Sequence, residues 1–476
     1  MSTLQWVATF VKILIMIGFL FNMGAILTWV DRRQSAMIQD RIGPNRAVVK
    51  IFGMEFRVFG LLHTAADGVK FFFKEDFMPP NADKLLFSLA PILAMMPVLA
   101  LVAVIPFGDT ISLDAFWMTA CPKGQLLDHG QCLDAMHKVV GSAVTFFPAV
   151  PRYGAPVPST HPIDLVVASL NVGVLYVFAL AGQGIVGAAI AGWSSDNKFS
   201  LMGALRAASQ MVSYEVTMGL SLVGAMMIYG TVRLDEMVRW QGENTWGIFA
   251  QPLAFFLFFT AAVAETKRIP FDLPEAESEL VSGYFTEYSG MKFGMFYFAE
   301  YMEIVTSSML LVTIFLGGWQ LPFLHRDGIS LEFGYWSGVH AYVPHIWVTI
   351  LQVMTFFGKV IAVCWMQAFV RWSLPRFRYD QLMKLGWRVL LPLSLLNVMV
   401  TGCIILGLEQ ASPYVQAGVK VVADVTQAFV LVALLGLLFA AVVGIFRPRK
   451  HEKLLTGTSA RFAAAKGGSK SSPMQA

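Results

Sequence analysis

The sequence predicts an all-α fold: a polytopic integral membrane helix bundle with about nine transmembrane helices and one interfacial amphipathic helix. Of its 476 residues, 56% are hydrophobic and 14% are charged, whereas apolar residues make up about 45–50% of a typical soluble domain. The chain also contains apolar runs of about 20 residues, the length that a helix needs to cross a bilayer. These runs are 6–30, 84–106, 164–192, 203–230, 247–265, 293–316, 345–370, 388–408 and 422–446.

Basic residues orient these spans. The first run is followed by Asp31-Arg32-Arg33 and not by a small-residue cleavage site, so we expect it to remain as a span. The loop 31–83 and later loops on the same side are rich in Lys and Arg, as cytoplasmic loops are. We therefore expect the N-terminus outside and the C-terminus in the cytoplasm. The formal net charge of +4 comes largely from these loops, so we expect the lipid bilayer, and no nucleic acid, as a partner.

The loop after the first span contains a second kind of helix. Its apolar residues recur at helical spacing, with Asp67 and Lys70 mostly off their face. This pattern favours an amphipathic helix that lies in the interface, although a surface helix covering neighbouring spans would show it too. The apolar positions are Val58, Leu61, Leu62, Ala65, Val69 and Phe72.

The chain divides into a main membrane domain, 1–408, an extra C-terminal transmembrane helix, 409–446, and a basic tail, 447–476, that we expect to be disordered in the cytoplasm. Within the main domain, 107–163 is a Pro- and Gly-rich external loop insertion. Four cysteines without a Cys-x-x-Cys pair indicate neither a metal site nor an iron–sulfur site. Cys121 and Cys132 lie in the external loop, where a disulfide and free thiols remain equal alternatives.

The segment Gly182-Gln183-Gly184-Ile185-Val186-Gly187 matches the dinucleotide-binding fingerprint letter for letter. The fingerprint requires a strand before it and a βαβ unit around it, and an apolar span provides neither. We interpret the small residues as a close helix-packing surface instead.

Eight carboxylates gather within about forty residues, between Ala264 and Glu303, in a chain that is otherwise poor in charge. Asp272 and Pro274 suit the start of a short helix, but Glu275 and Glu279 lie four residues apart, where like charges destabilise a helix. Local stability therefore does not explain the cluster. Carboxylates close together in a poorly hydrated place cannot all ionise, so such a set can load and release protons.

Glu215, Glu300 and Lys359 lie well inside predicted spans, and Glu303 shares a helix face with Glu300. A charge at the bilayer centre costs about 2.5–3.5 kcal/mol or more, so such residues usually face an internal cavity and mark an ion or proton path. The alternative for each glutamate is a neutral, hydrogen-bonded packing group. Lys359 is expected to pair with an acid or to lie in a water-filled cleft.

Several of these segments resemble the membrane subunit of respiratory complex I, the proton-pumping NADH:quinone oxidoreductase, called the H subunit in bacteria and subunit 1 in mitochondria. The resemblance covers most of 6–106 and 164–408. The matching segments are Asp40-Arg41-Ile42-Gly43-Pro44-Asn45, Ala66-Asp67-Gly68-Val69-Lys70, Ala191-Gly192-Trp193, the run 205–215, the whole of 264–301, and the run 374–383.

The resemblance implies a subunit of a quinone reductase that has no complete active site in this chain alone. It implies a quinone chamber beside the loop 265–290, the first cytoplasmic loop and the amphipathic helix, and a proton path that leads from the chamber into the membrane. The residues expected at the chamber are Arg41, Arg46, Asp67, Lys70, Arg268, Phe271 and Asp272. Those expected on the proton path are Glu215, Glu265, Glu275, Glu277, Glu279, Glu287 and Glu300.

The resemblance also implies a location and partners. The chain would lie in the bacterial cytoplasmic (inner) membrane and bind no cofactor of its own, with quinone as substrate. NADH, FMN and the iron–sulfur clusters would belong to partner subunits. These partners would be the peripheral-arm quinone module, which includes the subunit with the terminal cluster, and small and antiporter-like membrane subunits.

Two departures and two alternatives accompany this resemblance. The segments 107–163 and 409–476 exceed the usual family length, and Leu62-His63-Thr64-Ala65 lacks the Gln-Pro expected there, so no quinone contact is carried over to His63. A membrane anchor of a related energy-converting hydrogenase would have similar loops. A stand-alone ion transporter would need internal repeats and broken spans, and the sequence shows no such repeat.

Overall fold

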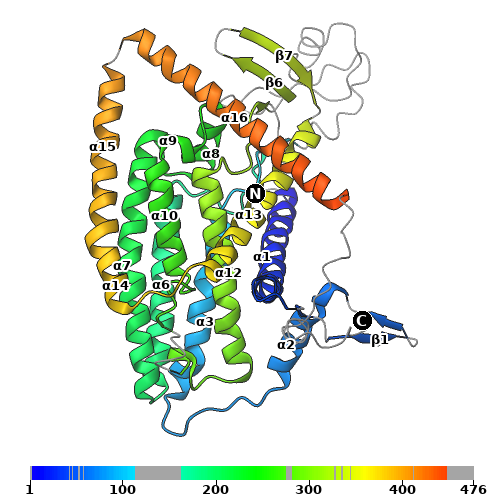
Figure 1. The fold of residues 1–476 in the computed structure, drawn as a ribbon, viewed down its shortest axis with the longest axis vertical. Helices are drawn as coiled ribbons and strands as arrows, with labels where there is room; N and C mark the ends of the chain where they lie inside the picture. Colours follow the sequence, from blue (N-terminus) through cyan, green and yellow to red (C-terminus); the bar gives the residue numbers. More distant parts are fainter. Residues whose placement is uncertain are drawn as a thin grey trace, which may run out of the picture.

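The computed structural model describes residues 3–41, 43–44, 47–51, 54–56, 58–112, 162–274, 281–325, 328–333, 336–343, 345–410 and 412–446. Within these ranges, eight helices are long and apolar enough to cross a membrane (Figure 1). This confirms the all-α membrane fold. The eight are α1 (Thr3–Ile38), α3 (Lys84–Leu101, continued by η2, Val102–Val104), α6 (Gly173–Ser194), α7 (Lys198–Tyr229), α12 (Gly290–Phe315), α13 (His345–Ser373), the continuous segment α14–η4–α15 (Tyr379–Lys384, Leu385–Leu390, Leu391–Glu409) and α16 (Pro413–Phe446).

The ninth predicted span, 247–265, differs from the prediction. It forms two shorter helices, α9 (Gly247–Ala250) and α10 (Pro252–Glu265), separated at Gln251. Fourteen residues in α10 rise about 21 Å, whereas the hydrocarbon core is about 30 Å thick. The sequence predicted one full span here because the run is largely apolar and contains no charged residue before Glu265. The polar but uncharged Gln251 gave no sign that the helix is interrupted.

Gln251 fixes the start of α10 to α15. Its Nε2 donates to Thr401 Oγ1 at 2.6 Å, and its Oε1 accepts from Asn397 Nδ2 at 2.9 Å. These three side chains are buried, so each satisfies polar groups that would otherwise lie unpaired inside the bundle.

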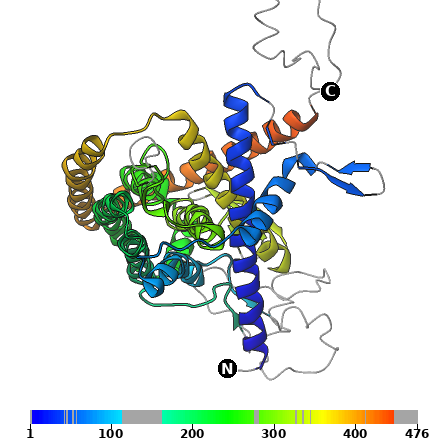
Figure 2. The same cartoon turned by 90° about the horizontal axis from the view of Figure 1, so that it is seen from below.

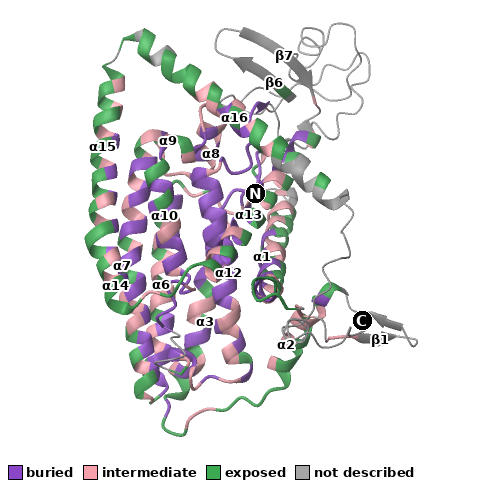
Figure 3. Ribbon diagram, viewed as in Figure 1, coloured by how far each residue is buried: buried purple, intermediate pink, exposed green. Residues whose placement is uncertain are grey.

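α12 lies at the centre of the bundle (Figures 1 and 3). Most of its residues are buried, and α1, α3, α10 and α13 pack around it. α15, in contrast, exposes much of its surface at the periphery. We call the end of the bundle where α10 finishes and α12 starts the loop end, and the end where α12 finishes at Phe315 the far end.

Small elements join and flank the helices. α8 (Leu234–Glu243) precedes α9, and the 3-10 turn η3 (Gly283–Phe285) lies shortly before α12. The strands are all antiparallel: β1 (Val49–Ile51) with β2 (Met54–Phe56), β3 (Ile111–Ser112) with β4 (Pro162–Ile163), and β6 (Gly328–Phe333) between β5 (Leu324–His325) and β7 (Trp336–Tyr342).

The predicted amphipathic helix is α2 (Leu62–Phe73), preceded by η1 (Val58–Gly60). It begins later than Val58, because the backbone at Phe59 adopts φ 52°, outside the helical region. Phe71 packs against α12 over Gly294, while Phe72 and Phe73 are 72% and 87% exposed. The helix therefore both contacts a neighbouring span and presents an apolar surface outward, as an interfacial helix does. Figure 2 shows it beside α1, at the edge of the bundle.

α16 contacts the bundle through a short polar patch. Thr426 Oγ1 lies 2.8 Å from Thr245 Oγ1, and Gln427 Nε2 donates to the carbonyl of Asn244. Several predicted features lie outside the described residues. They are most of the 107–163 insertion, both Cys121 and Cys132, and the tail 447–476.

The glycines of the false fingerprint lie within α6, and Gly187 confirms the packing interpretation. A Cβ built on Gly187 would lie 2.8 Å from the backbone N of Ala94 in α3. By comparison, a Cβ on Gly184, one turn earlier, would meet only the Met211 Cε, at 3.9 Å. The backbones of α3 and α6 therefore touch at Gly187.

We expect Gly187→Ala to destabilise the assembled protein by about 1–3 kcal/mol, the usual cost of overpacking against atoms that cannot move aside. Gly184→Ala is the matched control, because it shares the gain in helix propensity of about 1 kcal/mol. Thermal unfolding of the purified complex checks this, and equal melting temperatures for the two variants would contradict a backbone contact at Gly187.

Candidate functional site

The loop that follows α10 is held tightly to α7. Gln210, a buried residue of α7, donates its Nε2 to the carbonyls of Ala264 and Phe271, both at 2.8 Å. The carbonyl of Pro270 accepts from the backbone N of Phe377 at 3.0 Å. Residues 266–273 therefore have a fixed path, although they form neither a helix nor a strand.

Two of the predicted chamber residues, Phe271 and Asp272, anchor this loop. The Phe271 ring lies between Tyr214 and Phe377, with ring centroids 5.6 and 5.5 Å away. Asp272 forms an ion pair with Arg376. Phe271 and Asp272 are both buried. In this chain they contact the protein itself, and they join the loop to α7 and to the segment before α14.

Two ion pairs join the loop to α12, and the second of them is buried on both sides. Lys267 Nζ lies 3.2 Å from Glu303 Oε2, and Arg268 Nη2 lies 3.3 Å from Glu300 Oε2. Tyr284 adds a hydrogen bond from its hydroxyl to Glu300 Oε1 at 3.2 Å. Because removing one partner of a buried pair leaves an uncompensated charge, each pair is costly to break.

Lys267 lies close to three carboxylates. Its Nζ donates to Glu303, and the charges of Glu300 and Glu265 also act on it. One cation shared among several acids favours their ionised forms unequally, so the acids do not titrate independently.

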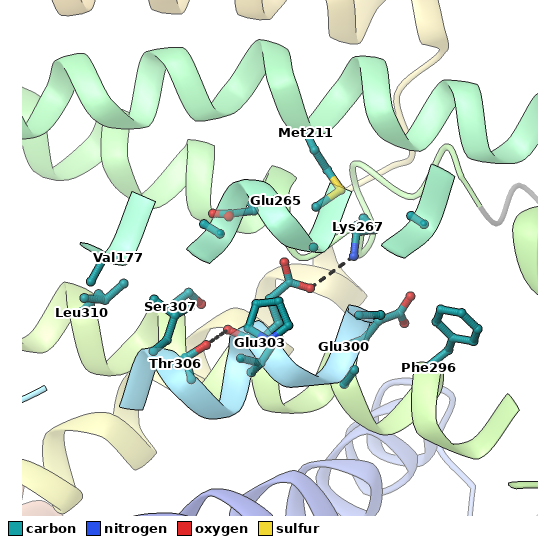
Figure 4. Close-up of a pocket in the computed structure, with 18 of the residues that line it drawn as sticks. Val177, Met211, Glu265, Lys267, Phe296, Glu300, Glu303, Thr306, Ser307 and Leu310 are labelled. Carbon is teal, nitrogen blue, oxygen red and sulfur yellow. Dashed lines mark hydrogen bonds and ion pairs between the residues drawn. The ribbon is translucent and has the colours of Figure 1, made fainter. Parts of the chain in front are cut away.

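These acids surround a small cavity between α3, α6, α7, α10 and α12 (Figure 4). Its volume is about 50 Å³, which is enough for several water molecules. Its polar lining comes from Glu265, Lys267, Glu300, Glu303, Thr306 and Ser307. We call it the acid cavity.

Glu215 adjoins this group from α7. Glu265 interacts electrostatically with both Glu303 and Glu215, and the Glu215 carboxylate lies against Gly182, whose missing side chain leaves room for it. Acids from α7, α10 and α12 therefore converge at membrane depth, although 88 residues separate Glu215 from Glu303 in the sequence. Such a set can pass protons through water and through one another's carboxylates.

A second cavity, of about 20 Å³, lies between α1, α12, α13 and the loop. Asp31 and Arg371 form an ion pair there, and Tyr301 donates its hydroxyl to Asp31 Oδ2 at 2.8 Å. The guanidinium of Arg268 stacks over the Tyr301 ring, 4.2 Å from its centroid. We call this space the arginine cavity.

Arg268 connects the arginine cavity with the acid cavity. Its side chain lines the arginine cavity, and its Nη2 pairs with Glu300, which lines the acid cavity. The exposed fraction of Arg268 is 5%. A change of charge near Asp31 and Arg371 therefore acts on Glu300 through one shared, poorly hydrated cation, where electrostatic interactions are strong.

Other predicted residues lie apart from both cavities. Glu287 accepts a hydrogen bond from Asn197 Nδ2 at 2.6 Å, Asp67 pairs with Arg32, and Arg41 and Lys70 are exposed near the loop end. Arg46, Glu275, Glu277 and Glu279 lie outside the described residues, as does the short helix predicted after Asp272.

Several residues of the site were absent from the predicted set. Lys267 and Arg371 counted in the sequence only as orientation signals, Asp31 only as part of a charged helix end, and Glu303 only as a neighbour of Glu300. Tyr301 gave no signal, although it follows Glu300 directly. Arg371 ends a long apolar run, and a charge at that depth was the available clue. In the part of the chain that the structure describes, no group of three or more His, Cys, Asp or Glu side chains could hold a metal ion.

Comparison with known proteins identifies the relatives of this chain. A family model described as NADH dehydrogenase matches residues 11–127 and 133–402. The NADH-quinone oxidoreductase H subunit 1 of Cytophaga hutchinsonii is 40% identical over 379 residues, 80% of this chain and 91% of that protein. The H subunit of Thermomicrobium roseum is 41% identical over 401 residues, which are 82% of this chain and 94% of that protein. The H subunit of Flavobacterium psychrophilum is 40% identical over 383 residues, which are 80% of this chain and 92% of that protein. The chain therefore belongs to the NADH dehydrogenase family, as a multi-pass membrane protein of the H-subunit type in the enzyme complex NADH-quinone oxidoreductase.

Proposed function

We propose that this subunit forms one wall of the quinone chamber and carries the first part of the path that couples quinone reduction to proton pumping. The observation that supports this most directly is the position of Arg268, between the arginine cavity and the acid cavity. The chamber side would be the arginine cavity, with Asp31, Tyr301 and Arg371. The membrane side would be the acid cavity, with Glu300 and its neighbours.

The size of the arginine cavity supports a wall and not a complete site. At about 20 Å³ it is smaller than a quinone ring, whereas complete small-molecule pockets usually measure about 300–1,000 Å³. In this proposal partner subunits of the peripheral arm close the chamber, and the one with the terminal iron–sulfur cluster supplies electrons. NADH, FMN and the clusters bind in those partners.

The chain's own contribution is electrostatic. Quinone reduction consumes electrons and protons, which changes the charge next to the Asp31–Arg371 pair. Arg268 responds because it stacks on Tyr301, the hydrogen-bond donor to Asp31, and also pairs with Glu300. A weaker hold of Arg268 on Glu300 favours a proton on that carboxylate, and Glu265, Glu303 and Glu215 then redistribute theirs. Glu275, Glu277, Glu279 and Glu287 remain candidates for the entry to this path.

The orientation follows the same proposal. The basic loops support a loop end on the cytoplasmic side. In this proposal the membrane is a bacterial inner membrane, and the peripheral arm attaches at the loop end. The N-terminus and the far end then face outward, and α2 lies in the cytoplasmic interface with its exposed Phe72 and Phe73 in the lipid. Small and antiporter-like membrane subunits would receive the protons.

Arg268→Ala should strongly reduce quinone reduction but leave NADH oxidation by an artificial acceptor unchanged, because that activity does not need this chamber. Removing the cation also leaves Glu300 buried without compensation, at a cost of about 3–5 kcal/mol. Adding Glu300→Gln should recover assembly, but quinone reduction should stay below that of Glu300→Gln alone. Both activities are measured in purified complex. Quinone reduction in the double variant as fast as in Glu300→Gln alone would show that Arg268 only neutralises Glu300.

Glu215→Gln and Glu300→Gln should each lower proton pumping by about 10²-fold, as expected for the loss of a positioned proton-transfer group, and should slow quinone turnover through the coupling. Glutamine retains the shape but cannot ionise. Glu409→Gln, at an exposed position, is the matched control and should pump normally. Proton uptake by proteoliposomes checks this. Normal pumping by both variants at normal assembly would mean that these carboxylates are packing groups and that the path runs elsewhere.

A further inference from the structure

Lys359 is a half-buried cation that the proposed path does not use. It lies on α13, and its ammonium donates to three backbone carbonyls at the far end of α12: Leu316 at 2.7 Å, Gly318 at 3.1 Å and Gln320 at 2.7 Å. Its Nζ also lies 4.1 Å from the centroid of the Trp246 ring. An aromatic face and three carbonyl oxygens form an environment that attracts positive charge.

The number of these contacts favours the charged form of Lys359 over the neutral amine. An ammonium has three N–H groups, one for each of the three carbonyls, whereas a neutral amine has fewer donors than this site has acceptors. The carboxyl end of a helix also carries partial negative charge, which favours a cation. Among the residues that the structure describes, no carboxylate lies within the 4.0 Å of an ion pair with Lys359.

Completing the helix end does not require this charge. Neighbouring carbonyls of α12 are satisfied by neutral side chains: Tyr229 donates its hydroxyl to Ile314 O at 2.7 Å, and Gln241 donates its Nε2 to Thr313 O at 2.9 Å. A lysine at membrane depth is much more costly than an apolar residue. The positive charge therefore needs a reason beyond the hydrogen bonds.

An apolar layer separates Lys359 from the acid cavity. Along α12 the lining of that cavity reaches Leu310, and beyond it Leu311, Val312 and Phe315 are fully buried. Phe255 and Phe258 of α10 pack against Phe315, with ring centroids 5.8 and 5.6 Å away. The hydroxyl of Thr313 is used within α12, where it donates to Met309 O at 2.8 Å.

We propose that Lys359 is an electrostatic barrier that stops protons on the acid cluster from escaping along α12 to the far side of the membrane. A fixed positive charge behind an apolar layer opposes a proton at that depth, as basic residues do in pores that exclude protons. The barrier closes the route from Glu265, Glu300 and Glu303 to the far side of the membrane, so that protons leave these acids toward neighbouring subunits. This inference rests on the proposed function, because it assumes that the acid cluster carries protons.

The test uses the complete complex in proteoliposomes that enclose a pH-sensitive dye. A potassium gradient with valinomycin drives protons in the absence of NADH, and pumping is then measured with NADH and quinone. Lys359→Met removes the charge at similar length, and Lys359→Arg is the matched control that keeps it. Lys359→Gln is a second neutral variant, whose amide has two N–H donors.

In the neutral variants, passive proton conductance should rise about tenfold or more, the effect of lowering a barrier by about 1.4 kcal/mol. Protons pumped per electron should fall, while quinone reduction with an uncoupler stays at the wild-type rate. Lys359→Arg should match wild type in all three measurements. Adding Glu300→Gln to Lys359→Met should suppress the leak, because the leak is expected to pass through the acid cluster.

Wild-type conductance and wild-type protons per electron in an assembled neutral variant would overturn the barrier role, as would a leak that persists with Glu300→Gln. If the Arg variant assembles but neither neutral variant does, Lys359 serves folding and the proposal is wrong. None of these outcomes affects the proposed function, which is tested separately by the pumping of Glu215→Gln and Glu300→Gln alone.

Discussion

A charge at membrane depth must be matched inside the protein, because the hydrocarbon offers no water to solvate it. In this chain most of the matched charges lie on α12 or at its ends. Its loop-end half carries Glu300 and Glu303, which meet Arg268 and Lys267, and its far end receives Lys359. Between these polar contacts the helix is buried among apolar side chains. The neighbouring helices thus take their places around a central helix that is held electrostatically at both ends.

The site is divided by α12 and reconnected by Arg268. Asp31 and Arg371 come from α1 and α13 on one side, whereas Glu265 and Glu215 come from α10 and α7 on the other. The guanidinium can serve both sides because it is planar, stacks on Tyr301 and still donates to a carboxylate. A lysine ammonium, as a compact point charge on a flexible stem, would satisfy Glu300 without this stacking. The geometry therefore explains why the two neighbouring cations, Lys267 and Arg268, are of different types.

Much of this arrangement could be predicted from the sequence, but the pairing could not. Length and hydropathy predicted the long helices, and isolated acids within apolar runs predicted Glu215 and Glu300 as special positions. The Asp31–Arg371 pair joins residues 340 apart in the chain, and no local pattern links them. Lys267 and Arg371 resembled the ordinary basic residues that flank spans, because hydropathy does not distinguish a cation at the interface from one folded back into the protein. The 247–265 run was counted as a full span for a similar reason, since apolar content does not show where a helix is interrupted.

The shortness of α10 determines how deep the two cations lie. Gln251 fixes its start to α15, and Gln210 fixes the carbonyl of Ala264, near its end, to α7. A loop that starts after only fourteen residues begins well inside the hydrocarbon thickness, so Lys267 and Arg268 reach Glu303 and Glu300 without crossing a full leaflet. The helix acts as a molecular ruler, because inserting a single residue would turn everything beyond it by about 100° and shift it by about 1.5 Å. Changes of apolar residue type within α10 should accordingly be tolerated in evolution far better than insertions or deletions, which would break the register between the loop and α12.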